Sequence, residues 1–177
     1  SASRFFDRTN ETDLLLNVGS GPTDVHPRAI NVDVFHFPNV HIIADAERMP
    51  FASDTFDAVC CEEVLEHIRR PENVVAEMKR VTKSGGHIIA FAEPDYSHRI
   101  DKPDELIQLG KWQTDSLIQQ GADPSAGGRL AGLFFQAGIK INETGTIHSG
   151  ESDASPEEWE IEWAVIESDL AESVSGE

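Results

Sequence analysis

The chain has 177 residues, of which 39% are hydrophobic, and this composition suits one domain, residues 1–177, with a buried core. Its 32 acidic and 14 basic residues give a formal net charge of −18, which repels phosphate backbones and argues against nucleic acid as a partner. No apolar run approaches the ~18 residues that span a bilayer, and the start lacks a signal pattern, so we expect a soluble cytoplasmic protein without membrane contact.

The acidic residues are spread along the whole chain rather than gathered in one tail, and few of the basic residues are lysines. A surface rich in acid and poor in lysine stays hydrated in concentrated salt. We therefore hypothesise a halophilic source for this chain.

Short apolar runs between polar linkers predict buried strands of a mostly parallel sheet. The runs cover residues 14–18, 29–33, 40–44, 56–61, 87–92 and 139–147. Residues 1–13 form a polar segment without periodicity. Too few residues separate Gly21 from the second strand for a full crossover helix, so the first such helix is predicted to be very short or absent.

Helical patterns fall between the later strands. A short helix is predicted over residues 62–70, and Pro71 suits the first turn of the next one, which residues 84–86 end. Further helices are predicted over residues 103–120, 130–137 and 155–171, the last of them acidic and amphipathic. The alternation predicts an α/β fold of the Rossmann-like type, with helices on both faces of the sheet.

Cys60 and Cys61 are adjacent, and neighbouring cysteines rarely form a disulfide. A metal site needs more ligands at spaced positions. We interpret the two residues as buried thiols on a strand, and we predict no metal site.

The first apolar run breaks at Gly19, Ser20 and Gly21, and the second ends on Asp33. Glycine after a buried strand lets the backbone approach a ligand closely. A carboxylate at the tip of the neighbouring strand can accept both hydroxyls of a ribose. The alternatives are an ordinary turn for the glycines and a solvated strand-end residue for Asp33.

Together with its later segments, the chain resembles the class I S-adenosylmethionine-dependent methyltransferases, in the small-molecule group called type 11. The resemblance spans residues 14–147 and rests on the order and spacing of residues 15–22, 31–33, 45–51, 53–59, 63–68 and 80–86. It implies S-adenosylmethionine as cofactor, S-adenosylhomocysteine as product and a small-molecule methyl acceptor as partner.

The resemblance also implies which residues hold the cofactor. The backbone of Gly19, Ser20 and Gly21 would lie against its methionine part. Asp33 would take the ribose hydroxyls, with Val34 beside it.

Two further pairs are implied at the ends of the third and fourth strands. Asp45, with Ala46 next to it, would accept from the adenine amino group, although a turn or helix-cap residue is the alternative. Cys61 and Glu62 would lie next to the sulfonium and its methyl group. Glu62 also suits the start of a helix, where an acid favours the dipole.

Residues 93–98 follow the fifth strand, and ligands of open α/β sheets bind outside the carboxyl ends of the strands. Asp95, Tyr96 and His98 are therefore the candidate catalytic residues, as general bases or as substrate clamps. The alternative is a plain turn, since Pro and Asp are common in turns.

We expect methyl transfer from S-adenosylmethionine to a small molecule. The alternative is a methyltransferase-like domain that binds cofactor or a partner without turnover, which suits the short first crossover and Pro22, where the family commonly has glycine. A nicotinamide dehydrogenase fits worse, because position 24 is Asp and Asp33 comes too early. The sequence leaves the oligomeric state open, a homo-oligomer included.

Overall fold

The computed structural model describes residues 5–22, 24–99, 101 and 104–145. A five-stranded sheet has the order β3-β2-β1-β4-β5, and every pairing in it is parallel. Its strands are β1 (Leu15–Val18), β2 (Ala29–Asp33), β3 (Ile42–Ile43), β4 (Phe56–Glu62) and β5 (Thr82–Phe91). The α-helices are α2 (Pro71–Val81), α3 (Ile107–Gln119) and α4 (Ala126–Gln136), and short 3-10 turns are η1 (Leu65–His67), η2 (Tyr96–His98) and η3 (Asp104–Leu106).

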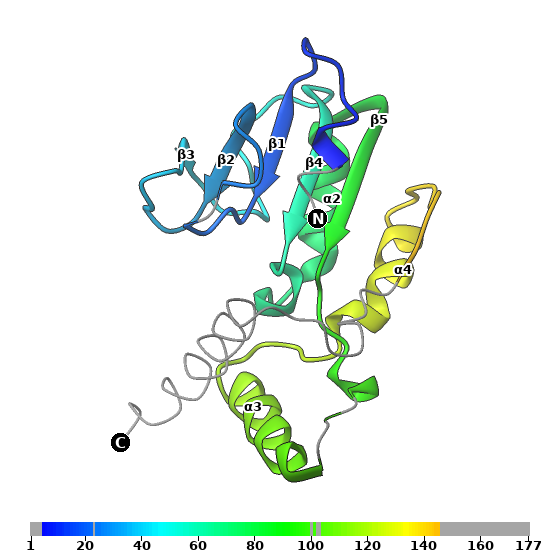
Figure 1. The fold of residues 1–177 in the computed structure, drawn as a ribbon. Helices are drawn as coiled ribbons and strands as arrows, with labels where there is room; N and C mark the ends of the chain where they lie inside the picture. The colour runs from blue at the N-terminus through cyan, green and yellow to red at the C-terminus, as the bar shows by residue number, and fades with distance from the viewer. Residues whose placement is uncertain (1–4, 23, 100, 102–103, 146–177) are drawn as a thin grey trace.

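This architecture confirms the predicted Rossmann-like α/β fold with its parallel sheet. The expected helices on both faces are not found among the described residues: α2 and α4 pack on one face, and a helical turn at Phe5 and Phe6 packs on the other. The strand arrows run in one direction in Figure 1, and α3 lies beyond their carboxyl ends. Parallel strands of this kind are joined by crossovers, and α2 forms the crossover from β4 to β5.

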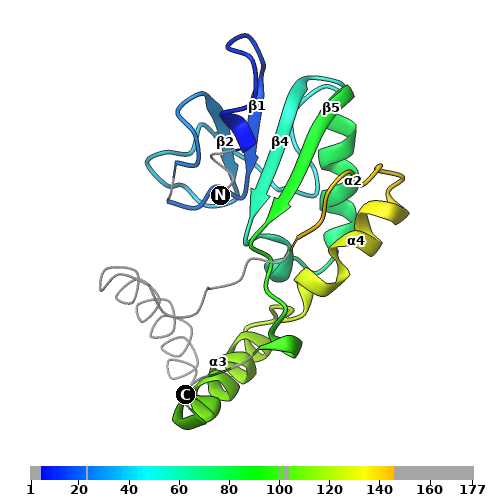
Figure 2. The same ribbon diagram turned by 45° about the vertical axis from the view of Figure 1, so that its right-hand side comes forward.

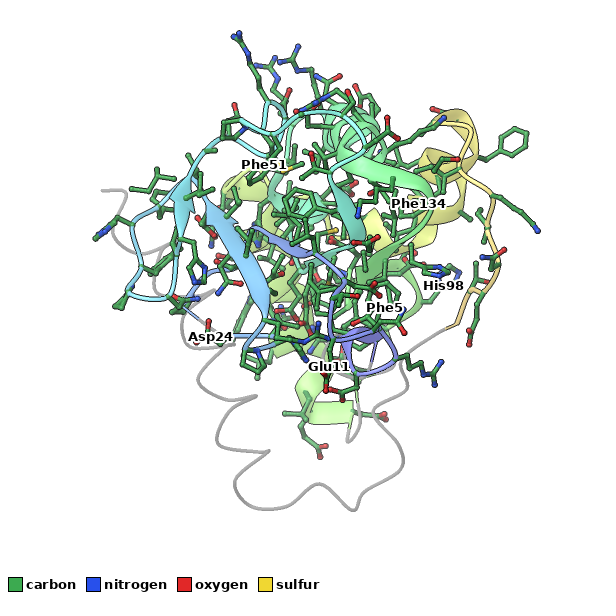
Figure 3. The ribbon with its side chains drawn as sticks, turned by 90° about the horizontal axis from the view of Figure 1, so that it is seen from above. Phe5, Glu11, Asp24, Phe51, His98 and Phe134 are labelled. Atoms are coloured by element: carbon green, nitrogen blue, oxygen red, sulfur yellow. The ribbon has the colours of Figure 1, made fainter. Side chains whose placement is uncertain are left out.

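Alternate residues of the central strands supply two separate cores, because successive side chains point to opposite faces. Leu16 and Val18 of β1 join the larger core with residues of α2 and α4. Leu15 joins the smaller core with Phe5 and Phe6, which end a helical turn before β1. Figure 2 shows α2 and α4 on the same side of the sheet, and Figure 3 shows Phe51 and Phe134 on the opposite side from Phe5.

The connection from β1 to β2 has no helix among its described residues, which confirms that prediction. Polar side chains tie it down instead. Asn17 and Asn31 face each other in register, each 1% exposed, and the Asn17 amide donates to Asn31 Oδ1 (3.2 Å). The Asn31 amide donates in turn to Asp24 Oδ1 (2.7 Å) and to the carbonyl of Asn39 (3.1 Å). Polar side chains, of which Asn17 and Asn31 are buried, thus tie this connection to the strands.

Two predicted strands are shorter in the structure or missing from it. The third is reduced from residues 40–44 to Ile42–Ile43. The strand predicted over residues 139–147 is wrong for its described part, residues 139–145, which form no regular element. The reason is local: the N–H of Ile139 donates to the carbonyl of Phe134 (2.9 Å) and so closes the end of α4.

The helix predicted over residues 62–70 is also wrong. Strand β4 continues to Glu62, the chain turns at Glu63 with φ of +52°, and only the single turn η1 follows. Strand β5 begins directly after α2 and takes in residues 84–86, where the pairing with β4 shifts register.

The other predicted helices are present. The helix that begins at Pro71 is α2, and the stripe over residues 130–137 belongs to α4. The region 103–120 contains η3 and α3, and Gly110 does not interrupt α3 because Asp101 packs against it, leaving no room for a Cβ. The helix predicted over residues 155–171 lies outside the described residues.

Two remaining predictions concern burial. Cys60 and Cys61 are both free and fully buried, as expected. The segment predicted to be polar over residues 1–13 also contributes to the smaller core, since Phe6 is fully buried against the sheet.

Candidate functional site

The candidate residues gather because the strands that precede them end at one edge of the sheet. Val18 pairs with Val32 of β2 on one side and with Cys61 of β4 on the other. The segments that follow β1, β2 and β4 therefore leave the sheet at the same level. In a parallel α/β sheet this edge is where ligands bind.

The loop after β1 uses glycine for two different reasons. Gly19 has φ of +65°, and a Cβ there would lie 2.5 Å from Cγ2 of Val64. Gly21 has φ of +55°, but no heavy atom lies within 4 Å of the position a Cβ would take. Gly19 is needed because the loop packs closely against Val64. At Gly21 the space beside the backbone is open, and we call this part of the loop the open strip of backbone.

Asp33 is 8% exposed and is already committed to the local backbone. Its Oδ2 accepts from the N–H of Gly21 (2.8 Å) and its Oδ1 from the N–H of Phe35 (2.9 Å). Because each carboxylate oxygen accepts about two hydrogen bonds, one further donor fits on each. Val34 and Phe35 beside it are 61% and 68% exposed. A carboxylate with spare acceptor capacity next to open apolar surface suits a nucleoside.

Gly21 is held from both sides, and one of its partners is a residue that the sequence analysis missed. The Asn39 side-chain amide donates to the carbonyl of Gly21 (3.0 Å), opposite the bond from Gly21 to Asp33. Asn39 belongs to the connection after β2, and its own carbonyl accepts from Asn31. An asparagine in a loop gives no sequence signal for such a role.

Asp45 and Ala46 follow β3 and are joined to β2 through the N–H of Ala44, which donates to the carbonyl of Asp33 (2.9 Å). Asp45 Oδ1 accepts from the N–H of Glu47 (2.8 Å), and its carbonyl accepts from the N–H of Arg48 (2.9 Å). Asp45 therefore shapes a turn, as the alternative interpretation held, and it does so at the predicted edge of the sheet.

Cys61 and Glu62 end β4 with different chemical prospects. Burial raises the pKa of the Cys61 thiol well above its ordinary value, so the residue contributes packing rather than a nucleophile. Glu62 is half-buried, and burial, assisted by the charge of Glu63, raises the pKa of its carboxyl group. Glu62 pairs in register with Phe91, which brings the ends of β4 and β5 together.

Asp95, Tyr96 and His98 form a cluster beyond β5. Asp95 accepts from the Ser97 hydroxyl and lies 2.9 Å from Nδ1 of His98; these two contacts lower the pKa of the Asp95 carboxyl. The N–H of Tyr96 donates to the carbonyl of Pro124 (2.8 Å) and its ring stacks under Arg99. The three residues are brought together, although none of them is buried.

Two further features at this edge escaped the sequence analysis. The carboxylate of Glu93 accepts from the N–H groups of Val64, Leu65 and Glu66. The first turn of α4 lies against the segment after β5, since a Cβ on Gly128 would lie 2.8 Å from Oδ2 of Asp95. The pair of glycines at positions 127–128 was the available signal, because adjacent glycines in a helix mark a close approach.

Among the described residues, no cluster of three or more His, Cys, Asp or Glu side chains is arranged to hold a metal ion. The same part of the chain contains no helix long and apolar enough to cross a membrane.

Comparison with known proteins finds similarity to methyltransferases. A family model described as "Methyltransferase domain" matches residues 22–90. A Schizosaccharomyces pombe protein described as an uncharacterized methyltransferase is 34% identical over 106 residues, which cover 59% of this chain and 37% of that protein. The demethylmenaquinone methyltransferase of Renibacterium salmoninarum is 40% identical over 62 residues, covering 33% of this chain and 26% of the relative. The chain thus spans about a third or less of the length of these relatives.

Among solved structures, a Bacillus halodurans protein described as a methyltransferase matches with a TM-score of 0.62. The match has 17% sequence identity and covers 80% of this chain and 68% of the other. At this identity the match establishes the fold.

Proposed function

We propose that the chain is a class I S-adenosylmethionine-dependent methyltransferase of the type 11 group and that it transfers the methyl group of S-adenosylmethionine to a small-molecule acceptor. The observation that carries the proposal is the arrangement of Gly21 and Asp33. An open strip of backbone and a carboxylate with spare acceptor capacity lie one hydrogen bond apart, at the edge where α/β sheets bind ligands.

The residues present fit the cofactor of this family. Asp33 would accept the ribose hydroxyls through the second lone pair of each oxygen. Val34 would offer its exposed side chain to the adenine, with Asp45 and Ala46 at the end of the neighbouring strand. Gly19, Ser20 and Gly21 are expected to leave room for the methionine part.

When bound, S-adenosylmethionine supplies the hard step, an electrophilic methyl on a sulfonium. The chain has to orient the acceptor and exclude water, and a base is needed only where the acceptor must lose a proton. His98 is the proposed base: its Nδ1 lies 2.9 Å from Oδ2 of Asp95, which would hold a proton on that nitrogen and leave Nε2 as the basic one. Tyr96, held by Pro124, is proposed to clamp the acceptor.

The small-molecule class of the acceptor rests on two supports. The name of the Renibacterium salmoninarum relative contains a small-molecule acceptor, demethylmenaquinone. The net charge of −18 disfavours a nucleic acid at this site.

Titration calorimetry with S-adenosylhomocysteine tests the cofactor half of the proposal. Wild type is expected to bind, and Asp33→Ala is expected to lose at least about tenfold in affinity, the equivalent of one to two hydrogen bonds. Asp57→Ala is the matched control, because Asp57 is an acid near the amino end of β4, remote from the site. Absence of binding by wild type at both low and high salt would refute the proposal.

Methyl-labelled cofactor tests the acceptor half. Label is expected in the small-molecule fraction of a cell extract and not in its protein or RNA fraction. Label transferred only to macromolecules would contradict the acceptor class while leaving cofactor binding intact. Cofactor binding with no transfer to any fraction would favour the domain without turnover.

A further inference from the structure

Glu93 is a buried acid that lies between the residues proposed to bind the cofactor and those proposed to bind the methyl acceptor. It follows β5 and Ala92, whose φ is +57°, and it is 9% exposed. Its Oε1 accepts from the N–H groups of Val64 (3.0 Å) and Leu65 (2.9 Å), and its Oε2 accepts from the N–H of Glu66 (3.0 Å). One side chain thus satisfies three consecutive backbone donors that are 27 to 29 residues away in sequence.

The residue directly before the backbone that Glu93 holds is strained, and the residue after it packs against the glycine loop. Glu63 has φ of +52°, and its N–H donates to the carbonyl of Phe91 (3.1 Å). The next residue, Val64, packs so close to Gly19 that a Cβ there would lie 2.5 Å from its Cγ2. The position of Val64 therefore fixes where the loop after β1 lies. Strained backbone persists only where its surroundings hold it in place, and here the carboxylate of Glu93 supplies that hold.

The backbone of Glu93 also contacts the first turn of α4, next to the residues proposed to bind the methyl acceptor. A Cβ on Gly127 would clash with the carbonyl oxygen of Glu93, and the N–H of Gly127 donates to the carbonyl of Pro94 (2.8 Å). Through these contacts Glu93 joins the end of β5 both to η1 and to the first turn of α4.

The charge of Glu93 is costly in this place. Burial raises the pKa of its carboxyl group, while the three backbone donors and His67 act in the opposite direction. A buried acid is not explained by overall stability, since an apolar side chain would avoid the desolvation. We attribute the presence of the acid to the three backbone hydrogen bonds that it accepts.

We propose that Glu93 is a positioning residue of the cofactor site, which fixes residues 64–66 so that Val64 and the ends of β1 and β4 keep the shape that receives the cofactor. This inference rests on the proposed function. Glu93 itself need not touch the ligand, since it acts through the backbone that it caps.

The test compares three variants at a temperature where all are folded. Glu93→Ala removes all three acceptor bonds. Glu93→Gln keeps one oxygen for the N–H groups of Val64 and Leu65 but points an amide NH2 at the N–H of Glu66. Asp57→Asn is the control, because that carboxylate also accepts a backbone N–H, from Leu14, near the opposite end of β4. Affinity for S-adenosylhomocysteine is measured by calorimetry, and amide exchange of residues 64–66 by NMR.

The expected affinity falls about tenfold in Glu93→Ala and about threefold in Glu93→Gln, and stays within about twofold of wild type in Asp57→Asn. Exchange of the amides of residues 64–66 is expected to accelerate in the Glu93 variants alone. Should Glu93→Ala fail to fold, Glu93→Gln carries the test. Wild-type affinity and unchanged exchange in the Glu93 variants overturn the inference. If wild type itself does not bind, the proposed function fails and the cofactor role of Glu93 fails with it.

Discussion

Replacing Gly19 and Gly21 with alanine separates two reasons for glycine in one loop. Both residues have positive φ, so Ala costs about 1–2 kcal/mol at each through the left-handed backbone. At Gly19 the new Cβ also meets Val64 at 2.5 Å, and overpacking of this kind costs about 1–3 kcal/mol more. At Gly21 no heavy atom lies within 4 Å of the new Cβ. Gly19→Ala is therefore expected to lower the free energy of unfolding by about 2–5 kcal/mol, and Gly21→Ala by about 1–2 kcal/mol.

Urea unfolding of the two variants at one salt concentration measures the difference. The loss of unfolded-chain entropy is the same for both substitutions, so it cancels in the comparison. With a slope of about 1–3 kcal/mol per molar urea, the two midpoints should differ by roughly 1 M. Equal destabilisation by the two substitutions would refute the packing role of Gly19. A larger loss of unfolding free energy in Gly21→Ala than in Gly19→Ala would refute it as well. A Val64→Ala background, which opens space beside Gly19, should reduce the difference.

Three further outcomes are expected. Lys83 and the Leu14 N–H lower the pKa of Asp57, so the stabilisation by Asp57 is complete above the unfolded-state pKa and is lost as pH falls through the folded-state value. Asp57→Asn should accordingly lower the free energy of unfolding by up to about 1 kcal/mol at neutral pH, and by less as pH falls through the folded-state pKa of Asp57, as read from urea unfolding; an equal cost across this range would contradict it. The Cys60 and Cys61 thiols, whose pKa values burial raises, should react with a thiol reagent only at the rate of unfolding; rapid labelling of native protein would show otherwise. If the charge of −18 marks a halophilic protein, unfolding should be harder in about 2 M KCl than in about 0.1 M, and equal stability would remove that hypothesis.

Local patterns predicted the elements whose cause is local. The strand over 29–33 has the expected bounds and the helix begins at Pro71 as expected, because a continuous apolar run and a first-turn proline each specify their own structure. The end of that helix differs, since it stops at Val81 and residues 84–86 lie in β5. Residues 139–145 fail for the converse reason. Their isoleucines suit a strand, but a strand also needs a partner, and Ile139 instead closes α4.

The helix expected over residues 62–70 shows how a distant side chain overrides a local signal. The acids and apolar residues after β4 are compatible with a helix. The N–H groups of Val64, Leu65 and Glu66 instead find their acceptor in Glu93, and a single 3-10 turn results. Nothing in the local sequence announces an acceptor 27 residues or more away.

The candidate site divides in the same way. Gly21 and Asp33 could be predicted because each ends a recognisable strand and neighbouring strand ends meet. Asn39, Asn31 and Glu93 could not, because their roles come from contacts between connections that the strand pattern does not place. The residues proposed to bind the cofactor were readable from the sequence, and those that hold them in position were not.

The position of β1 in the sheet has a consequence for the order of folding. Leu15 pairs with Ala29 of β2 but also with Ala58 of β4, so during synthesis the central strand is followed closely by its first neighbour and gains its second neighbour later. Closing the longer of these two loops costs about 1 kcal/mol more chain entropy than closing the shorter one. Until β4 emerges, one edge of β1 stays open to any other strand. The acidic residues spread along the chain keep such half-built molecules apart by charge repulsion, so the surface charge protects the nascent chain as well as the finished fold.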